Sequence, residues 1–155
     1  MKKLILPLIL VMSCLVACTS DEKSLKKAAE AAAAAQFKST IEEEAKGYLT
    51  QSDTFLNAYV SFMVKFAEFS AEDIKLNGGV MGSATVYITS YPPDVRKGLL
   101  KVAATVSPAA VNRFNFANAY QLIAKETGRP GEPMKYLFVV YNLRKDTHGD
   151  WVVQK

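Results

Sequence analysis

The sequence predicts an α+β domain in which two N-terminal helices pack on an antiparallel sheet, with an inserted helix and a C-terminal β-hairpin. Three observations predict this class. Apolar residues recur with helical spacing early in the chain, they alternate with polar residues from about residue 74 onward, and Gly- or Asp-rich turn signals separate the alternating segments. Half of the residues are apolar, an ordinary supply for a hydrophobic core.

The N-terminal segment has the composition of a secretory signal. Lys2 and Lys3 precede an apolar stretch of fourteen residues from Leu4 to Ala17. In a helix, such a stretch would cover about 21 Å, short of the roughly 30 Å hydrocarbon core of a bilayer. We therefore interpret it as a cleaved signal peptide rather than a membrane-spanning helix.

The end of this segment, Leu15-Val16-Ala17-Cys18, resembles the lipobox of bacterial lipoprotein signal peptides. The resemblance implies cleavage before Cys18, a diacylglycerol on its thiol, and a fatty acid such as palmitate on the new amino terminus. Thr19, where an aspartate would signal inner-membrane retention, implies delivery to the periplasmic face of the outer membrane. The alternative is that Cys18 is a small core residue. Cys14 is predicted to leave with the signal peptide.

Processing divides the chain into a signal peptide at residues 1–17, a lipidated tether at residues 18–24 and a single α+β domain at residues 25–155. The mature chain would have 138 residues, 17 of them basic and 15 acidic, with no free thiol. This charge balance gives no reason to expect a nucleic-acid partner. The predicted partners are the membrane, through the lipid on Cys18, and another envelope component.

Two helices should follow the tether. Ser24 is a plausible N-cap for a helix from Leu25 to Leu49, whose run of alanines at residues 28–35 predicts either a linker or close helix packing. A second helix is predicted from Asp53 to Phe69. It carries an aromatic stripe, which indicates either the main core face or a face for a hydrophobic ligand. The stripe consists of Phe55, Tyr59, Phe62, Phe66 and Phe69.

Strand signals come next. Residues 74–76 and 82–91 are predicted strands joined by an Asn77-Gly78-Gly79 turn, and Pro92-Pro93 ends the second strand. Residues 98–106 fit both a strand and a helix, and we favour a strand because of Gly98 and the β-branched residues. The glycines of residues 78–83 lack the Lys-Ser/Thr ending of a phosphate-binding loop, which favours a connection between strands.

The remaining elements are a helix and a hairpin. Ser107 and Pro108 predict a helix through Thr127, closed by Gly128. Residues 134–143 form the clearest strand, apolar on both alternating sets, and 151–153 complete a hairpin. The leading helices and the Gly-Asp-Trp-Val-Val ending at residues 149–153 resemble the cystatin-like or NTF2-like roll of small lipoproteins. This likeness implies a fold and no function.

Residues able to do chemistry are few. His148 lies in an Asp- and Gly-rich segment that indicates a turn more than a base or cation site. Zinc would need more His and Cys ligands than the mature chain has, and no Gly-x-Ser-x-Gly segment is present to offer a serine nucleophile. We therefore predict no metal, no cofactor and no catalytic residue. The Glu42-Glu43-Glu44 run is interpreted as a solvated helix face.

Arg113, with Asn112 and Asn115 beside it, is the candidate binding site, although these residues also suit the solvated side of a helix. We therefore predict a non-enzymatic lipoprotein that binds another envelope component, either a protein or a cell-wall polymer. The alternative is a binder of a small hydrophobic ligand, with a pocket between the aromatic helix and the sheet.

Overall fold

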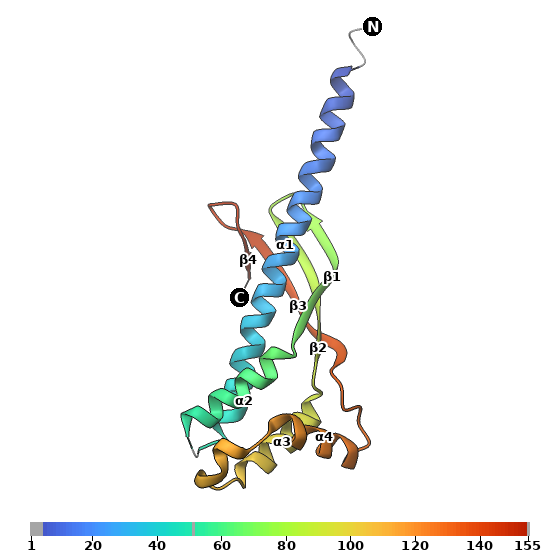
Figure 1. Cartoon of the computed structure of the whole chain (residues 1–155). Coiled ribbons are helices and arrows are strands. Elements are labelled where there is room, and N and C mark those ends of the chain that lie inside the picture. Colours follow the sequence, from blue (N-terminus) through green and yellow to red (C-terminus); the bar gives the residue numbers. More distant parts are fainter. Residues whose placement is uncertain (1–4, 51, 155) are drawn as a thin grey trace. The chain divides into compact units, whose positions relative to one another are not determined.

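The computed structural model describes residues 5–50 and 52–154, with side chains from Ser20 onward (Figure 1). The strands form one four-stranded antiparallel sheet in the order β1-β2-β3-β4, which confirms the predicted α+β class. The contacts divide the chain into two compact units. Unit 1 comprises Met1–Ala32, Ser70–Val86 and Phe138–Lys155, and unit 2 comprises Ala33–Phe69 and Tyr87–Leu137.

Helix α1 spans Ile5–Lys46. The predicted start at Leu25 is therefore wrong, and the residues expected to form a tether are helical here. Ser24 lies inside the helix, where its Oγ donates a hydrogen bond to the carbonyl of Asp21 at 2.9 Å instead of capping. The cause is composition, because Ala, Lys and Glu favour helix and no Gly or Pro interrupts residues 8–46.

From Leu25 to Leu49, every fourth residue is buried. In unit 1 these are Leu25 and Ala29. In unit 2 they are Ala33, Phe37, Ile41, Ala45 and Leu49. Four residues turn a helix by about 400°, so this stripe rotates around the axis by about 40° per step. Full burial of two residues from the alanine run shows close packing rather than a linker.

Helix α2 spans Asp53–Lys65 and has the predicted N-terminus. The Oγ of Ser52 accepts a hydrogen bond from the Phe55 backbone N–H at 3.1 Å, which caps the first turn. The helix ends before the predicted Phe69 because strand β1 already begins at Glu68. Its buried side chains are Phe55, Tyr59, Val60 and Met63.

Strands β1 (Glu68–Asn77) and β2 (Met81–Ser90) flank the predicted turn, where Gly78 and Gly79 have φ of +62° and +73°. Strand β1 starts earlier than predicted. Asp73 has φ of +49°, and the more buried positions change from odd to even numbers there, as expected at a β-bulge. Near this point, the Ala71 N–H donates to Glu30 on α1 at 3.0 Å.

Residues 93–104 form helix α3 (Pro93–Ala104), which corrects the strand expected at 98–106. Pro93 occupies the first turn, where its fixed φ and missing N–H suit a helix. Leu100 is buried but Val102 is exposed, so the apparent alternation does not mark one face. Gly98 serves helix packing, because a Cβ there would lie 2.9 Å from Cγ2 of Ile123 on α4.

The single helix expected at 107–127 is wrong, because two elements replace it. A 3₁₀ helix, η1, spans Pro108–Arg113, and helix α4 spans Phe116–Glu126. The break occurs where the Asn115 side chain accepts a hydrogen bond from the Asn118 N–H at 3.0 Å and starts a new helix. Gly128, at φ +67°, follows the end of α4 as predicted.

Strand β3 spans Met134–Lys145 and pairs with β4 (Trp151–Val153), with Leu143 opposite Val153, which confirms the C-terminal hairpin. The burial pattern along β3 explains why both of its alternating sets of residues are apolar. Tyr136 is partly buried early in the strand, whereas Tyr141 and Leu143 are buried later, so the inward parity changes along it.

Candidate functional site

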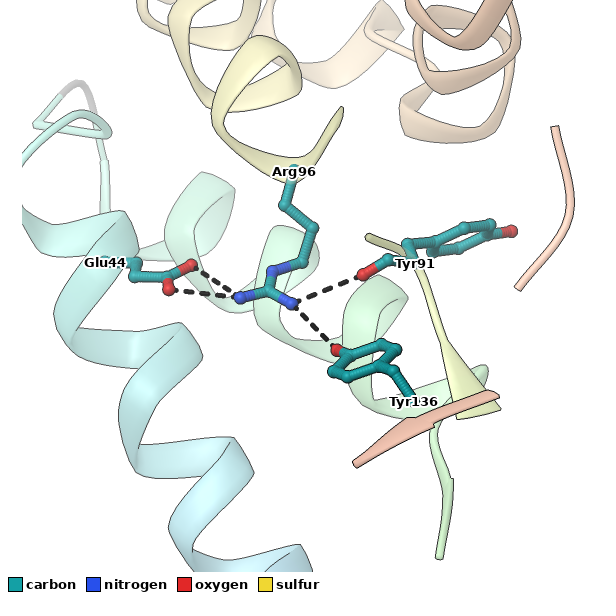
Figure 2. A network of polar contacts seen from close by, with 4 residues as sticks. All are labelled: Glu44, Tyr91, Arg96 and Tyr136. Atoms are coloured by element: carbon teal, nitrogen blue, oxygen red, sulfur yellow. Dashed lines mark hydrogen bonds and ion pairs between the residues drawn. The ribbon is translucent and has the colours of Figure 1, made fainter. Parts of the chain in front are cut away.

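The most polar point of the unit 2 interior is Arg96 on α3, which is 4% exposed. Figure 2 shows its guanidinium between the side chains of Glu44 and Tyr136 and the backbone carbonyl of Tyr91, which come from three other segments. Nη2 donates to the two carboxylate oxygens of Glu44 at 3.1 and 3.3 Å. Nη1 donates to the Tyr91 carbonyl and to the Tyr136 hydroxyl, both at 3.3 Å. We call this set the Arg96 network.

The Arg96 network orients structural elements. A buried guanidinium is costly unless its donors are paired. Here one carboxylate and two further oxygens pair with Nη1 and Nη2, whereas Nε has no hydrogen-bond partner. Its carbon lies 5.6 Å from the ring centre of Phe37, which adds a cation–π contact. Because Glu44 and Phe37 belong to α1, the network fixes α3 against this part of α1 in unit 2.

The phenol of Tyr59 interacts electrostatically with Arg96 and Glu44 of the network. Burial is the main reason that the pKa of Tyr59 is raised, and Glu44 raises it further while Arg96 opposes the shift. Tyr59 therefore keeps its proton to a higher pH than an exposed tyrosine does. Sequence patterns do not indicate this network, because the Glu42-Glu43-Glu44 run predicts a solvated helix face. In the structure, the Glu44 side chain is only 25% exposed.

An open groove of about 450 Å³ runs beside α4 in unit 2. Its apolar lining consists of Val102, Phe114, Ala119, Leu122 and Ile123. Its polar lining consists of Arg113, Asn115, Asn118 and Glu126. Leu122 is 65% exposed and Val102 is 41% exposed, so large apolar side chains meet solvent along this groove. We call it the α4 groove.

Two of the three predicted binding residues line the α4 groove, and Asn112 does not belong to its lining. The Asn115 side-chain oxygen is already used to cap α4. Arg113 is thus the cation at the end of the groove where α4 begins, and Glu126 is the anion where α4 ends. The ten-residue separation from Phe116 to Glu126 corresponds to about 15 Å.

Phe55 and Tyr59 of the aromatic stripe are buried in the core, and the stripe's other three residues are partly buried. The ring of Phe116 on α4 lies 5.1, 5.6 and 5.9 Å from the rings of Phe55, Tyr59 and Phe62. Phe62 also stacks on Tyr91 at 5.6 Å. These centroid distances are those of rings in direct contact. The rings of α2 therefore fill space with one another and with Phe116, as the core interpretation predicted.

His148 belongs to a turn, as predicted. Asp146 accepts hydrogen bonds from the backbone N–H groups of His148 and Asp150 at 2.8 and 2.9 Å, while the imidazole is largely exposed. Gly78 and Gly79 likewise connect two strands rather than forming a phosphate-binding loop. Among the residues described, no three His, Cys, Asp or Glu side chains come together to hold a metal ion.

The proposed lipidation site, Cys18, has its side chain outside the described part of the chain, and Lys2 and Lys3 also lie outside it. Within the described residues, no helix has both the length and the apolar character that a membrane span requires.

The comparisons identify no relative: no family model, no curated protein and no solved structure matches this chain. The likeness to cystatin-like or NTF2-like rolls therefore stays a prediction.

Proposed function

We propose that this chain is a lipid-anchored lipoprotein of the bacterial cell envelope, held at the periplasmic face of the outer membrane. It binds another envelope component and catalyses no reaction. The observation that carries the proposal is Leu15-Val16-Ala17-Cys18 placed directly after fourteen mostly apolar residues. Two or three acyl chains on Cys18 would hold the chain stably on a membrane, whereas one would bind only marginally.

The α4 groove supports the binding part of this proposal. Its exposed Leu122 and Val102 offer apolar area, and Arg113 and Glu126 place opposite charges near its two ends. An apolar centre with a polar rim is the usual anatomy of a protein interface. These features favour a protein segment over a cell-wall polymer, because sugars present little apolar surface. The segment would place an acidic residue near Arg113 and a basic one near Glu126.

Membrane anchoring would strengthen such binding without any additional contact. A domain confined to a surface meets a partner on the same surface at a high effective concentration. A groove of modest area can therefore act in the envelope even when the isolated domain binds weakly.

The membrane address is tested with Cys18→Ala, using Cys14→Ala as the matched control. We expect Cys14→Ala to be processed and to fractionate with membranes like the unchanged chain. Cys18→Ala should remain at precursor size and incorporate no radiolabelled palmitate. Normal size and labelling of Cys18→Ala would contradict the lipoprotein assignment.

The binding surface is tested by placing a photo-crosslinking amino acid at position 122 of the full chain in intact cells. Position 137 is the control, because Leu137 is also a highly exposed leucine of unit 2, at 57% against 65% for Leu122. We expect a discrete crosslinked protein from position 122 and none above background from position 137. Equal products from both positions would remove the α4 groove as the binding surface.

A further inference from the structure

We propose that the turn between β1 and β2 contacts the membrane and inserts Val80 and Met81 into its apolar layer. This inference rests on the proposed lipidation of Cys18, and it adds a second membrane contact made by the folded domain itself. The turn, residues 78–81, belongs to unit 1, as do the residues that immediately follow Cys18.

The turn is attached to the helical turn of α1 that follows Cys18. The backbone N–H of Lys145 donates to the Val80 carbonyl at 2.9 Å. The ammonium of the same lysine donates to the Asp21 carboxylate at 2.7 Å. Asp21 lies three residues after Cys18, a helical rise of about 4.5 Å. One lysine therefore links Val80 to a point close to the expected acyl chains.

A second attachment lies on the other side of Met81. A Cβ at Gly82 would collide with the Leu25 side chain and would lie 2.9 Å from the Lys75 carbonyl oxygen. The β2 backbone thus approaches α1 closely at Leu25, about 10 Å along the helix from Cys18. In Figure 1 the β1–β2 turn and the β3–β4 turn both lie beside this part of α1.

The turn itself is apolar and exposed. Val80 is 57% exposed and its neighbour Met81 is 45% exposed. Gly78 and Gly79 adopt positive φ and carry no side chain that would hold the turn away from a surface. Two adjacent large apolar side chains at the end of unit 1 nearest the anchor would gain by leaving water for lipid.

Charge does not provide an alternative attraction. From Cys18 onward, the segments of unit 1 contain seven basic and seven acidic residues, so their net charge is zero. Clusters of basic residues are what draw a protein surface to anionic headgroups. The expected contact is therefore with acyl chains, and it should not depend on salt or on the fraction of anionic lipid.

The test uses the full chain, processed in cells and reconstituted in vesicles of phosphatidylethanolamine and phosphatidylglycerol. Val80→Cys and Val140→Cys each carry a nitroxide, because the lipidated chain would have no other free thiol. The two valines are matched, at 57% and 58% exposed in unit 1. Val140 lies five residues before Lys145 along β3, about 16 Å away. Collision rates with oxygen and with a water-soluble nickel complex report the depth of each label.

We expect the label at position 80 to collide at least about twofold less with nickel than the label at position 140, and more with oxygen, at low and high salt alike. Equal accessibility on vesicle-bound, lipidated protein would overturn the insertion and leave the anchor intact. Protection that disappears at high salt would also overturn it, by showing headgroup attraction. An unmodified Cys18 thiol, detected by its own labelling, would remove the anchor and this inference together.

Discussion

The two units each attach α1 to another element with an ion pair, but the pairs are built differently. In unit 2, Glu44 meets Arg96, whose side chain is 5% exposed, through two hydrogen bonds. In unit 1, Asp21 meets Lys145, whose side chain is 22% exposed, through one contact. Removing a partner from a buried arginine leaves an unpaired charge out of water, which costs stability. A partly solvated lysine that loses its partner can form hydrogen bonds with water instead. We therefore expect the ion pair to contribute more to the stability of unit 2, and close packing to contribute more to the stability of unit 1.

The largest expected effect comes from Glu44→Ala, which leaves a buried guanidinium without its carboxylate. We expect the free energy of unfolding, measured by urea denaturation, to fall by about 3–5 kcal/mol. Glu43→Ala is the control, because Glu43 is exposed on the same helix and should change stability by less than about 0.5 kcal/mol. The double variant Glu44→Leu, Arg96→Met should recover most of the loss. If the double variant is as unstable as Glu44→Ala, the ion pair itself stabilises the fold more than apolar packing at these positions does.

Packing should matter more in unit 1, which is tested with two glycines. Gly82→Ala places a Cβ against the Leu25 side chain and a backbone carbonyl, and should cost about 1–3 kcal/mol in urea denaturation. Gly98→Ala in unit 2 meets only a methyl group of Ile123, and alanine favours the helix by about 1 kcal/mol, so the two effects nearly cancel. Equal losses at both positions would contradict this contrast.

Alkaline pH should weaken unit 2 through its buried phenols. Burial, with smaller contributions from Tyr91 and Asp94, raises the pKa of Tyr120 to about 12. An unfolded tyrosine ionises near pH 10, so this stabilisation is complete below pH 10 and is lost as the pH rises to about 12. Tyr120→Phe should make the urea midpoint fall less steeply over that range. Tyr48, which is 38% exposed, is the control position, and an equal change from Tyr48→Phe would show that burial is not the cause.

The smallest effect is expected from Asp21→Asn, which removes the solvated ion pair of unit 1. The free energy of unfolding should change by less than about 1 kcal/mol in low salt, and the difference should vanish near 1 M salt. Urea denaturation at the two salt concentrations measures this. A loss as large as that of Glu44→Ala would mean that the two pairs do not differ as their exposure indicates.

Short sequence motifs correctly predicted the turns and helix starts that are held by hydrogen bonds or backbone angles within a few residues. Ser52 caps α2, the glycines at 78 and 79 turn β1 into β2, and Asp146 closes the β3–β4 turn, each through its own backbone neighbours. Helix α3 was missed because its apolar residues fit two periods. What decided between them was Pro93 at the helix start and the contact of Gly98 with Ile123, and the second of these exists only in the folded chain.

The candidate site was predictable only in part. Arg113 and Asn115 stood out as polar residues among aromatics, and both line the α4 groove. The apolar lining was not predicted, because a single helix was expected where the extended residues Phe114 and Asn115 separate η1 from α4. The Arg96 network joins residues 52 positions apart, so no local pattern could indicate it.

The most direct test of the central proposal is the intact mass of the protein extracted from bacterial membranes. If the chain is lipidated, we expect 138 residues that begin at Cys18 and carry a diacylglycerol and, on the amino terminus, a fatty acid. A chain that retains residues 1–17, with an unmodified Cys18 thiol, would contradict it.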